Sequence, residues 1–101
     1  MENNLTIAKT IIQQLGGNKF IAMTGARNIF ADGQGVTMQI MKNKSKAKYL
    51  TIQLNSLDLY DMQFKSIDKD FNLIIKAEKQ NVYAEDLETI FTNITGLNTR
   101  L

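Results

Sequence analysis

The sequence predicts an α+β protein: an N-terminal helix, an antiparallel meander of about five strands, and a C-terminal helix. Three observations support this prediction. Apolar residues recur at helical spacing near both ends of the chain, they alternate with polar residues in between, and the turns are too short for crossover connections. We expect a single domain over residues 1–101, with both helices on one face of the sheet.

The first predicted element is a helix over residues 4–15. Its apolar positions form one stripe at helical spacing, consisting of Leu5, Ala8, Ile11, Ile12 and Leu15. Gly16 and Gly17 follow directly and end the helix, because glycine tolerates the left-handed conformation that closes a helix.

The central part of the chain changes to a period of two, which is typical of half-buried strands. The stretches that show it are residues 20–24, 28–30, 36–40, 49–55, 61–65 and 71–76, with Gly25 as a bulge or turn between the first two. Helical spacing then returns at Leu87, Ile90, Phe91, Ile94 and Leu97. We therefore expect a last helix over residues 83–95, with Gly96 as its C-cap.

One face of the predicted sheet is left bare if both helices cover the other face. The alternation assigns polar residues to this outer face, and Ile21, Met23, Leu59 and Ile74 could join it. Such a surface is either solvated or used for a partner, including a second copy of the chain. The polar residues assigned to it are Thr37, Gln39, Tyr49, Thr51, Gln53, Asp61, Gln63, Lys65, Asn72 and Lys76.

Charge is distributed unevenly along the chain, although the net charge is only +2. Residues 1–50 carry seven basic and two acidic residues, whereas residues 51–101 carry five basic and eight acidic residues. Lys42, Lys44, Lys46 and Lys48 occupy every second position before Tyr49. This pattern suits contact with phosphates and stacking of Tyr49 on a base, or a solvated loop whose lysines oppose aggregation.

Several kinds of chemistry are excluded or disfavoured by the residue types. His and Cys are absent, so His- or Cys-dependent catalysis, the usual zinc sites and thiol chemistry are excluded. Asp68, Asp70 and Asn72 match the opening of a calcium loop, but Leu73 and Lys79 replace its required Gly and Glu. We expect no enzymatic activity, no cofactor and no metal. No apolar run reaches membrane-spanning length and no signal-peptide pattern is evident, so we expect a cytoplasmic protein.

Several stretches of the chain resemble a known group of proteins. They are QQLGGNKFIAMTGARN at residues 13–28, LNSLDLYDM at residues 54–62, VYAEDL at residues 82–87 and FTNITGL at residues 91–97. Together they resemble a family of small uncharacterised proteins encoded by phages, prophages and other mobile elements. The resemblance implies a bacterial host and, by analogy, a protein that acts by occupying a host target.

Three functions remain open from the sequence. The first is an anti-CRISPR-like inhibitor that occupies a host protein or ribonucleoprotein complex. The second is an accessory protein that binds single-stranded DNA or RNA, and the third is an oligomeric binder of an anionic nucleotide. The candidate binding residues for all three are Arg27, Lys42, Lys44, Lys46, Lys48, Tyr49, Gln53, Gln63 and Lys65.

Overall fold

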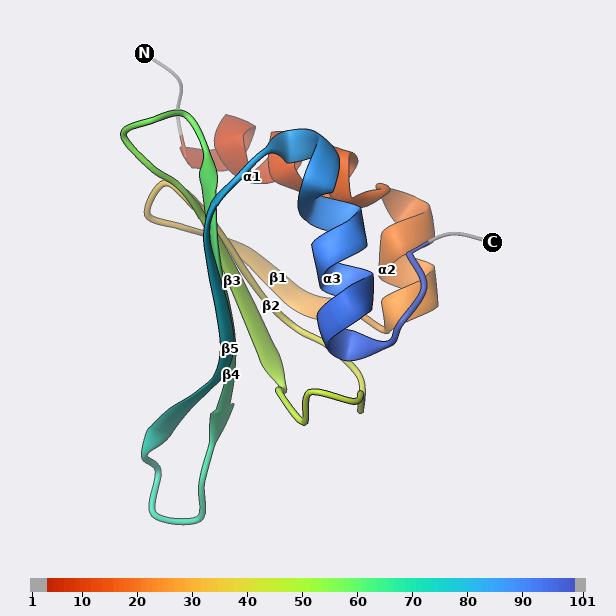
Figure 1. The fold of residues 1–101 in the computed structure, drawn as a ribbon, viewed down its shortest axis with the longest axis vertical. Helices are drawn as coiled ribbons and strands as arrows, with labels where there is room; N and C mark the ends of the chain where they lie inside the picture. The colour runs from red at the N-terminus through yellow and green to blue at the C-terminus, as the bar shows by residue number, and fades with distance from the viewer. Residues whose placement is uncertain (1–3, 100–101) are drawn as a thin grey trace.

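The computed structural model of the protein describes residues 4–99. Over this range two helices come first, then five strands, then a short 3-10 turn and a third helix (Figure 1). In chain order they are α1 (Asn4–Leu15), α2 (Asn18–Thr24), β1 (Arg27–Asp32), β2 (Gly35–Gln39), β3 (Tyr49–Leu54), β4 (Tyr60–Ile67), β5 (Leu73–Val82), η1 (Ala84–Asp86) and α3 (Leu87–Thr95).

The five strands form one antiparallel sheet in the order β1-β2-β3-β4-β5, which confirms the predicted meander. Figure 1 shows the helices together on one side of the sheet, as the sequence predicts, with the other side uncovered. Gly35 is needed where β2 begins, because a Cβ atom there would lie 1.7 Å from the carbonyl oxygen of Ile52. None of the helices within residues 4–99 is long and apolar enough to cross a membrane.

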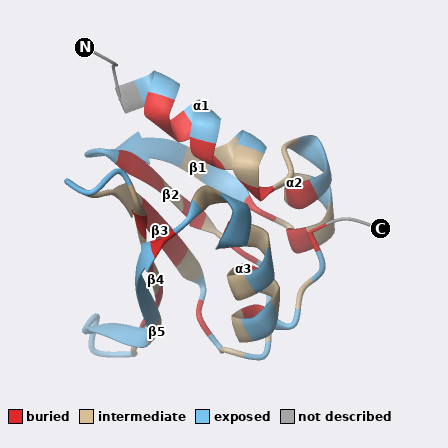
Figure 2. Cartoon of the chain, turned by 45° about the horizontal axis from the view of Figure 1, so that its top comes forward, coloured by how far each residue is buried: buried red, intermediate tan, exposed pale blue. Residues whose placement is uncertain are grey.

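The core lies between the helices and the inner face of the sheet (Figure 2). Strands β2, β3 and β4 direct alternate side chains into it, so the period-two prediction is confirmed there. Phe91 of α3 is fully buried, with its ring centroid 5.1 Å from that of Phe20 and 6.1 Å from that of Phe64. The fully buried apolar side chains that these strands contribute are Val36, Met38, Leu50, Ile52, Met62 and Phe64.

The strand predicted at residues 20–24 is wrong, because this segment is the helix α2. Phe20 and Thr24 lie one helical turn apart and are both fully buried, and the Thr24 hydroxyl donates to the Phe20 carbonyl oxygen at 2.7 Å. Gly25 then adopts a left-handed conformation and ends the helix. Ile21 and Met23 therefore belong to a helix and not to the outer face of the sheet.

The C-terminal helix is confirmed, with η1 forming its first turn and α3 continuing to Thr95. Gly96 is its left-handed C-cap, as predicted, and its N–H donates to the carbonyl oxygen of Thr92 at 2.8 Å. Leu87, Phe91 and Thr95 form the buried stripe of α3. The N-terminal helix also ends at Leu15, directly before the two glycines, as the sequence indicates.

The prediction for residues 71–76 is only partly correct. Phe71 and Asn72 belong to the turn, and β5 begins at Leu73 and continues to Val82. Phe71, Leu73 and Ile75 are not in the core but are 88%, 60% and 50% exposed. The reason is length: nine residues of α3 extend over about 14 Å, whereas ten residues of β5 extend over about 33 Å. The β4–β5 hairpin therefore projects beyond the helices, and we call residues 66–76 the arm (Figure 1).

Candidate functional site

Within residues 4–99, an open hollow of about 810 Å³ lies at the end of the sheet where β2 passes into β3. It is formed by the β2–β3 loop (residues 40–48) and the adjoining ends of β1, β2 and β3. Among residues 4–99, those that line it include five cationic residues and no carboxylate. Its charged and aromatic residues are Arg27, Lys42, Lys44, Lys46, Lys48 and Tyr49.

The side chain of Asn43 organises the β2–β3 loop from within. Its amide nitrogen donates to the carbonyl oxygens of Met41 and Ala47, each at 2.8 Å. Its amide oxygen accepts hydrogen bonds from the backbone N–H and the hydroxyl of Ser45. One residue thus holds both sides of the loop, which orients the backbone that carries the four lysines.

The same loop is attached to its surroundings at several points. The N–H of Met41 donates to the carbonyl oxygen of Thr24 at 3.1 Å, and the N–H of Lys44 donates to that of Thr95 at 2.9 Å. These bonds join the loop to the ends of α2 and α3. Ala47 is only 2% exposed, so its methyl group anchors the loop in the core while Lys46 and Lys48 remain exposed. The lysines therefore project from a fixed backbone.

The wall of the hollow is a row of outer-face residues on neighbouring strands. The strand register pairs Arg27 with Gln39 and Gln39 with Tyr49. The side-chain oxygen of Gln39 accepts from the Nε of Arg27 at 3.2 Å and from the amide of Asn28 at 2.9 Å. Gln39 therefore holds the side chains of Arg27 and Asn28 and is also the cross-strand neighbour of the half-buried Tyr49, so that Arg27 and Tyr49 line the hollow from either side of Gln39.

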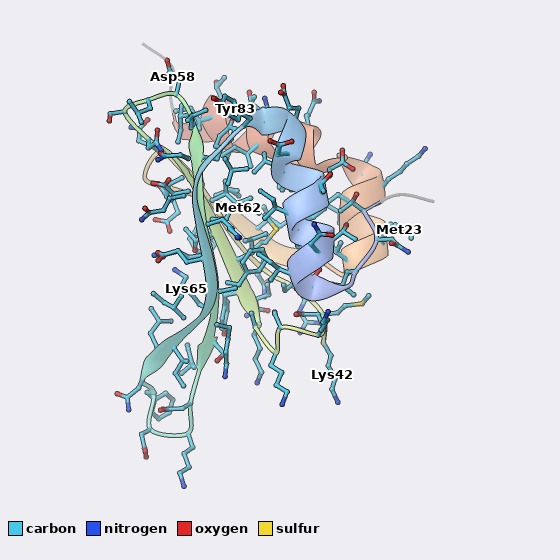
Figure 3. The ribbon with its side chains drawn as sticks, viewed as in Figure 1. Met23, Lys42, Asp58, Met62, Lys65 and Tyr83 are labelled. Carbon is cyan, nitrogen blue, oxygen red and sulfur yellow. The ribbon has the colours of Figure 1, made fainter. Side chains whose placement is uncertain are left out.

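The remaining predicted site residues lie outside the hollow. Gln53 braces the β1–β2 turn, because its amide donates to the carbonyl oxygen of Asp32 and accepts from the N–H of Gln34. Gln63 donates to the carboxylate of Glu78 at 2.7 Å. Lys65 is the cross-strand neighbour of Tyr49 and lies on the uncovered face, on the opposite side of the sheet from Met62 (Figure 3). Lys65 can extend the basic surface, whereas both glutamines have structural partners.

The centre of the outer face is packed rather than open to ligands. The hydroxyl groups of Thr37 and Thr51 lie 3.1 Å apart, and Thr51 is only 7% exposed. The Thr37 hydroxyl also donates to the carboxylate of Asp32 at 2.7 Å. These polar groups form hydrogen bonds with one another. The candidate binding surface is therefore the basic end of the sheet and not the whole outer face that the sequence suggested.

The hollow has the chemistry of an anion site. Five cationic residues line it without a carboxylate, and an anionic group would reduce the repulsion among them. Its volume falls in the range of about 300–1,000 Å³ typical of ligand pockets. The sequence did not single out Gln39 or Asn43 as site residues, because their hydrogen bonds depend on the partners that the fold brings to them.

No family model, curated protein or solved structure matches this chain significantly. The resemblance to mobile-element proteins therefore stays a prediction.

Proposed function

We propose that this protein is a non-catalytic binding protein whose basic hollow holds the phosphates of single-stranded DNA or RNA. The observation that carries the proposal is that Arg27, four lysines and Tyr49 all line one hollow. Single-stranded nucleic acid combines phosphates with unpaired bases, and proteins bind it through a positive groove together with aromatic stacking.

Two further features support a single strand rather than a duplex. The hollow is concave and contains Tyr49 in its wall, which suits an unpaired base better than the convex backbone of a duplex. The row from Arg27 through Gln39 and Tyr49 continues to Lys65 on β4, so a strand leaving the hollow meets another cation. The site thus has both an aromatic contact and a path for the backbone.

Fluorescence polarisation of labelled single-stranded oligonucleotides, measured over a series of salt concentrations, tests the proposal. We expect binding at low salt that weakens steeply as salt rises, because each phosphate contact releases counterions. Replacing Lys42, Lys44, Lys46 and Lys48 together by alanine should lower the slope of log K against log salt by about 2–3 units.

The chain offers a matched control with the same change in charge. Lys9, Lys19, Lys69 and Lys79 lie outside the hollow, so replacing these four by alanine should weaken binding far less. Equal effects of the two variants would mean that only net charge matters, and the proposal would be wrong. It would also be wrong if free mononucleotides displaced the oligonucleotide at equal phosphate concentration, which would instead favour a small nucleotide ligand.

Occupancy of a host protein or ribonucleoprotein complex rests on the resemblance and on the absence of the usual catalytic residue types. It stays a prediction, because none of the contacts within residues 4–99 distinguishes a host protein from another partner. A pull-down from host lysate tests it separately, and recovery of no partner would count against it.

A further inference from the structure

The arm carries apolar side chains that the rest of the molecule does not cover. Ile67 and Leu73 are cross-strand partners, and Ile75 pairs with Lys65, so these three side chains share the uncovered face. Phe71 is 88% exposed in the turn and has a φ of 65°, a left-handed conformation that is rare for a bulky residue. We call Ile67, Phe71, Leu73 and Ile75 the arm cluster.

We propose that the arm cluster is a self-association surface, on which a second copy of this chain packs its own arm around a two-fold axis. None of the four side chains lines the basic hollow, so the apolar contact does not rest on the proposed function, although the basic base of the arm shares Lys48 and Lys65 with the proposed nucleic-acid surface. The inference rests on two observations: the area of the cluster and the arrangement of charges around it.

The area suits a reversible dimer. From their exposed fractions, the four side chains present on the order of 450 Å² per copy, since a fully exposed side chain of this size presents roughly 200 Å². Two copies would bury on the order of 900 Å² from these side chains alone. The aliphatic parts of the neighbouring side chains in the arm add to this area. The contact then approaches the lower limit of about 1,200 Å² for specific interfaces. This area predicts a weak dimer that depends on concentration rather than an obligate one.

The charges favour a second copy over an unrelated partner. Asp68, Lys69 and Asp70 lie at the tip of the arm and give it a net charge of −1, whereas Lys65 lies at its base beside Lys48, whose N–H donates to the Lys65 carbonyl oxygen at 2.8 Å. When two arms cross in opposite directions over the cluster, the acidic tip of one copy meets the basic base of the other. The two-fold axis makes this contact twice, so the surface is complementary to itself.

Edge-to-edge pairing of β5 with another β5 is disfavoured by the strand itself. The β4–β5 register shifts twice, between Tyr60 and Met62 and between Phe64 and Lys65. Such irregularities, together with the exposed Lys76 and Lys79 along the strand, are features that prevent edge pairing in natural sheets. The face of the arm, not the edge of β5, is therefore the contact that we propose.

Sedimentation velocity of the full chain over a range of concentrations tests the inference. We expect a monomer–dimer equilibrium, and we expect Leu73→Ser to raise the dissociation constant at least tenfold. Leu57→Ser is the matched control, because Leu57 is 66% exposed and lies in the turn between β3 and β4, away from the arm. A wild-type protein that is monomeric at every concentration, or an equal effect of Leu57→Ser, would overturn the inference.

A charge exchange tests the direction in which the arms cross. Asp70→Lys should weaken the dimer by bringing like charges together, and adding Lys65→Asp in the same chain should restore it. Asp70 is chosen because the carboxylate of Asp68 holds the turn through the N–H groups of Asp70 and Asn72. If the double variant stays as weak as Asp70→Lys, the proposed crossing is wrong.

Discussion

The β2–β3 loop and the arm are exposed connections at the same end of the sheet, but they are ordered in opposite ways (Figure 1). The loop has little regular structure, yet Asn43 bonds both of its sides and Ala47 anchors it in the core. The arm is a regular hairpin, yet its apolar side chains have no covering layer. Regular strand pairing and burial of side chains are therefore separate properties. The loop is anchored without regular pairing, whereas the arm is regularly paired without burial of its apolar side chains.

The difference has a consequence for function. A loop whose backbone is already ordered loses less backbone entropy when a ligand binds, which favours affinity for an anion. An uncovered apolar arm gains free energy only when another surface covers it. The loop is therefore suited to phosphate recognition, whereas the arm is suited to contact with protein.

The largest expected effect compares a covered phenylalanine with an uncovered one. Phe91→Ala removes a ring packed between Phe20 and Phe64 and should cost about 3–5 kcal/mol of unfolding free energy. Phe71→Ala removes a ring that is 88% exposed and should change stability by less than about 0.5 kcal/mol. Urea denaturation at low protein concentration measures both, and similar losses would show that the arm is packed against the core after all.

The next effect concerns the aromatic wall of the hollow. Tyr49→Ala should weaken binding of a single-stranded oligonucleotide by about 1–3 kcal/mol, because the stacking platform is lost. Tyr49→Phe keeps the ring and should bind like the wild type. Tyr83→Ala is the control, because Tyr83 is 58% exposed and lies outside the hollow (Figure 3). A loss in Tyr83→Ala as large as in Tyr49→Ala would argue against stacking in the hollow.

A smaller effect tests whether the loop is fixed in advance. Asn43→Ala removes the donors to the carbonyl oxygens of Met41 and Ala47 and should cost about 1 kcal/mol of unfolding free energy. All five cations remain, so weaker oligonucleotide binding in this variant would reflect lost positioning rather than lost charge. Asn93→Ala, on the exposed side of α3, is the control for thermal melting and binding. Unchanged affinity in Asn43→Ala would show that the loop needs no such support.

The contrast between the loop and the arm also shows which parts of the fold can be predicted from the sequence. The helices at both ends and strands β2 to β4 are predictable, because each has one apolar face and a clear period. The segment of residues 20–24 is not, because Phe20, Ile21, Ala22 and Met23 form a short apolar run that fits either period. Alternation in the arm predicts a strand correctly, but it contains no information about where the covering helices end.

The candidate site was predictable in part for the same reason. The spacing of the four lysines draws attention to the loop, and in the structure Arg27 and Tyr49 line the same hollow as these lysines. Gln53 and Gln63 have the right residue type and the right face, but the fold gives them structural partners in Asp32 and Glu78. A polar side chain on a sheet face is therefore a site candidate only once its own hydrogen bonds are known.

The smallest expected effect is a pH-dependent change in the turn of the arm, which the carboxylate of Asp68 holds. The pKa of Asp68 is lowered below the ordinary value of 3.8, mainly because its carboxylate accepts a hydrogen bond from the backbone N–H of Asn72. The N–H of Asp70 lowers the pKa further, while partial burial opposes both. Since the folded pKa is depressed, the turn is fully stabilised above pH 3.8 and loses this contribution as the pH falls through the folded pKa.

NMR detects this loss directly. The amide protons of Asp70 and Asn72 should shift with a midpoint below pH 3.8 in the wild type, and this transition should be absent in Asp68→Asn, whose amide oxygen accepts the same bonds without titrating. The stability of the core should not follow this midpoint, because the turn lies beyond the helices (Figure 1). A midpoint at or above 3.8 would show that the carboxylate does not hold the turn, and the acidic tip would then lack the fixed geometry that crossing of the arms requires.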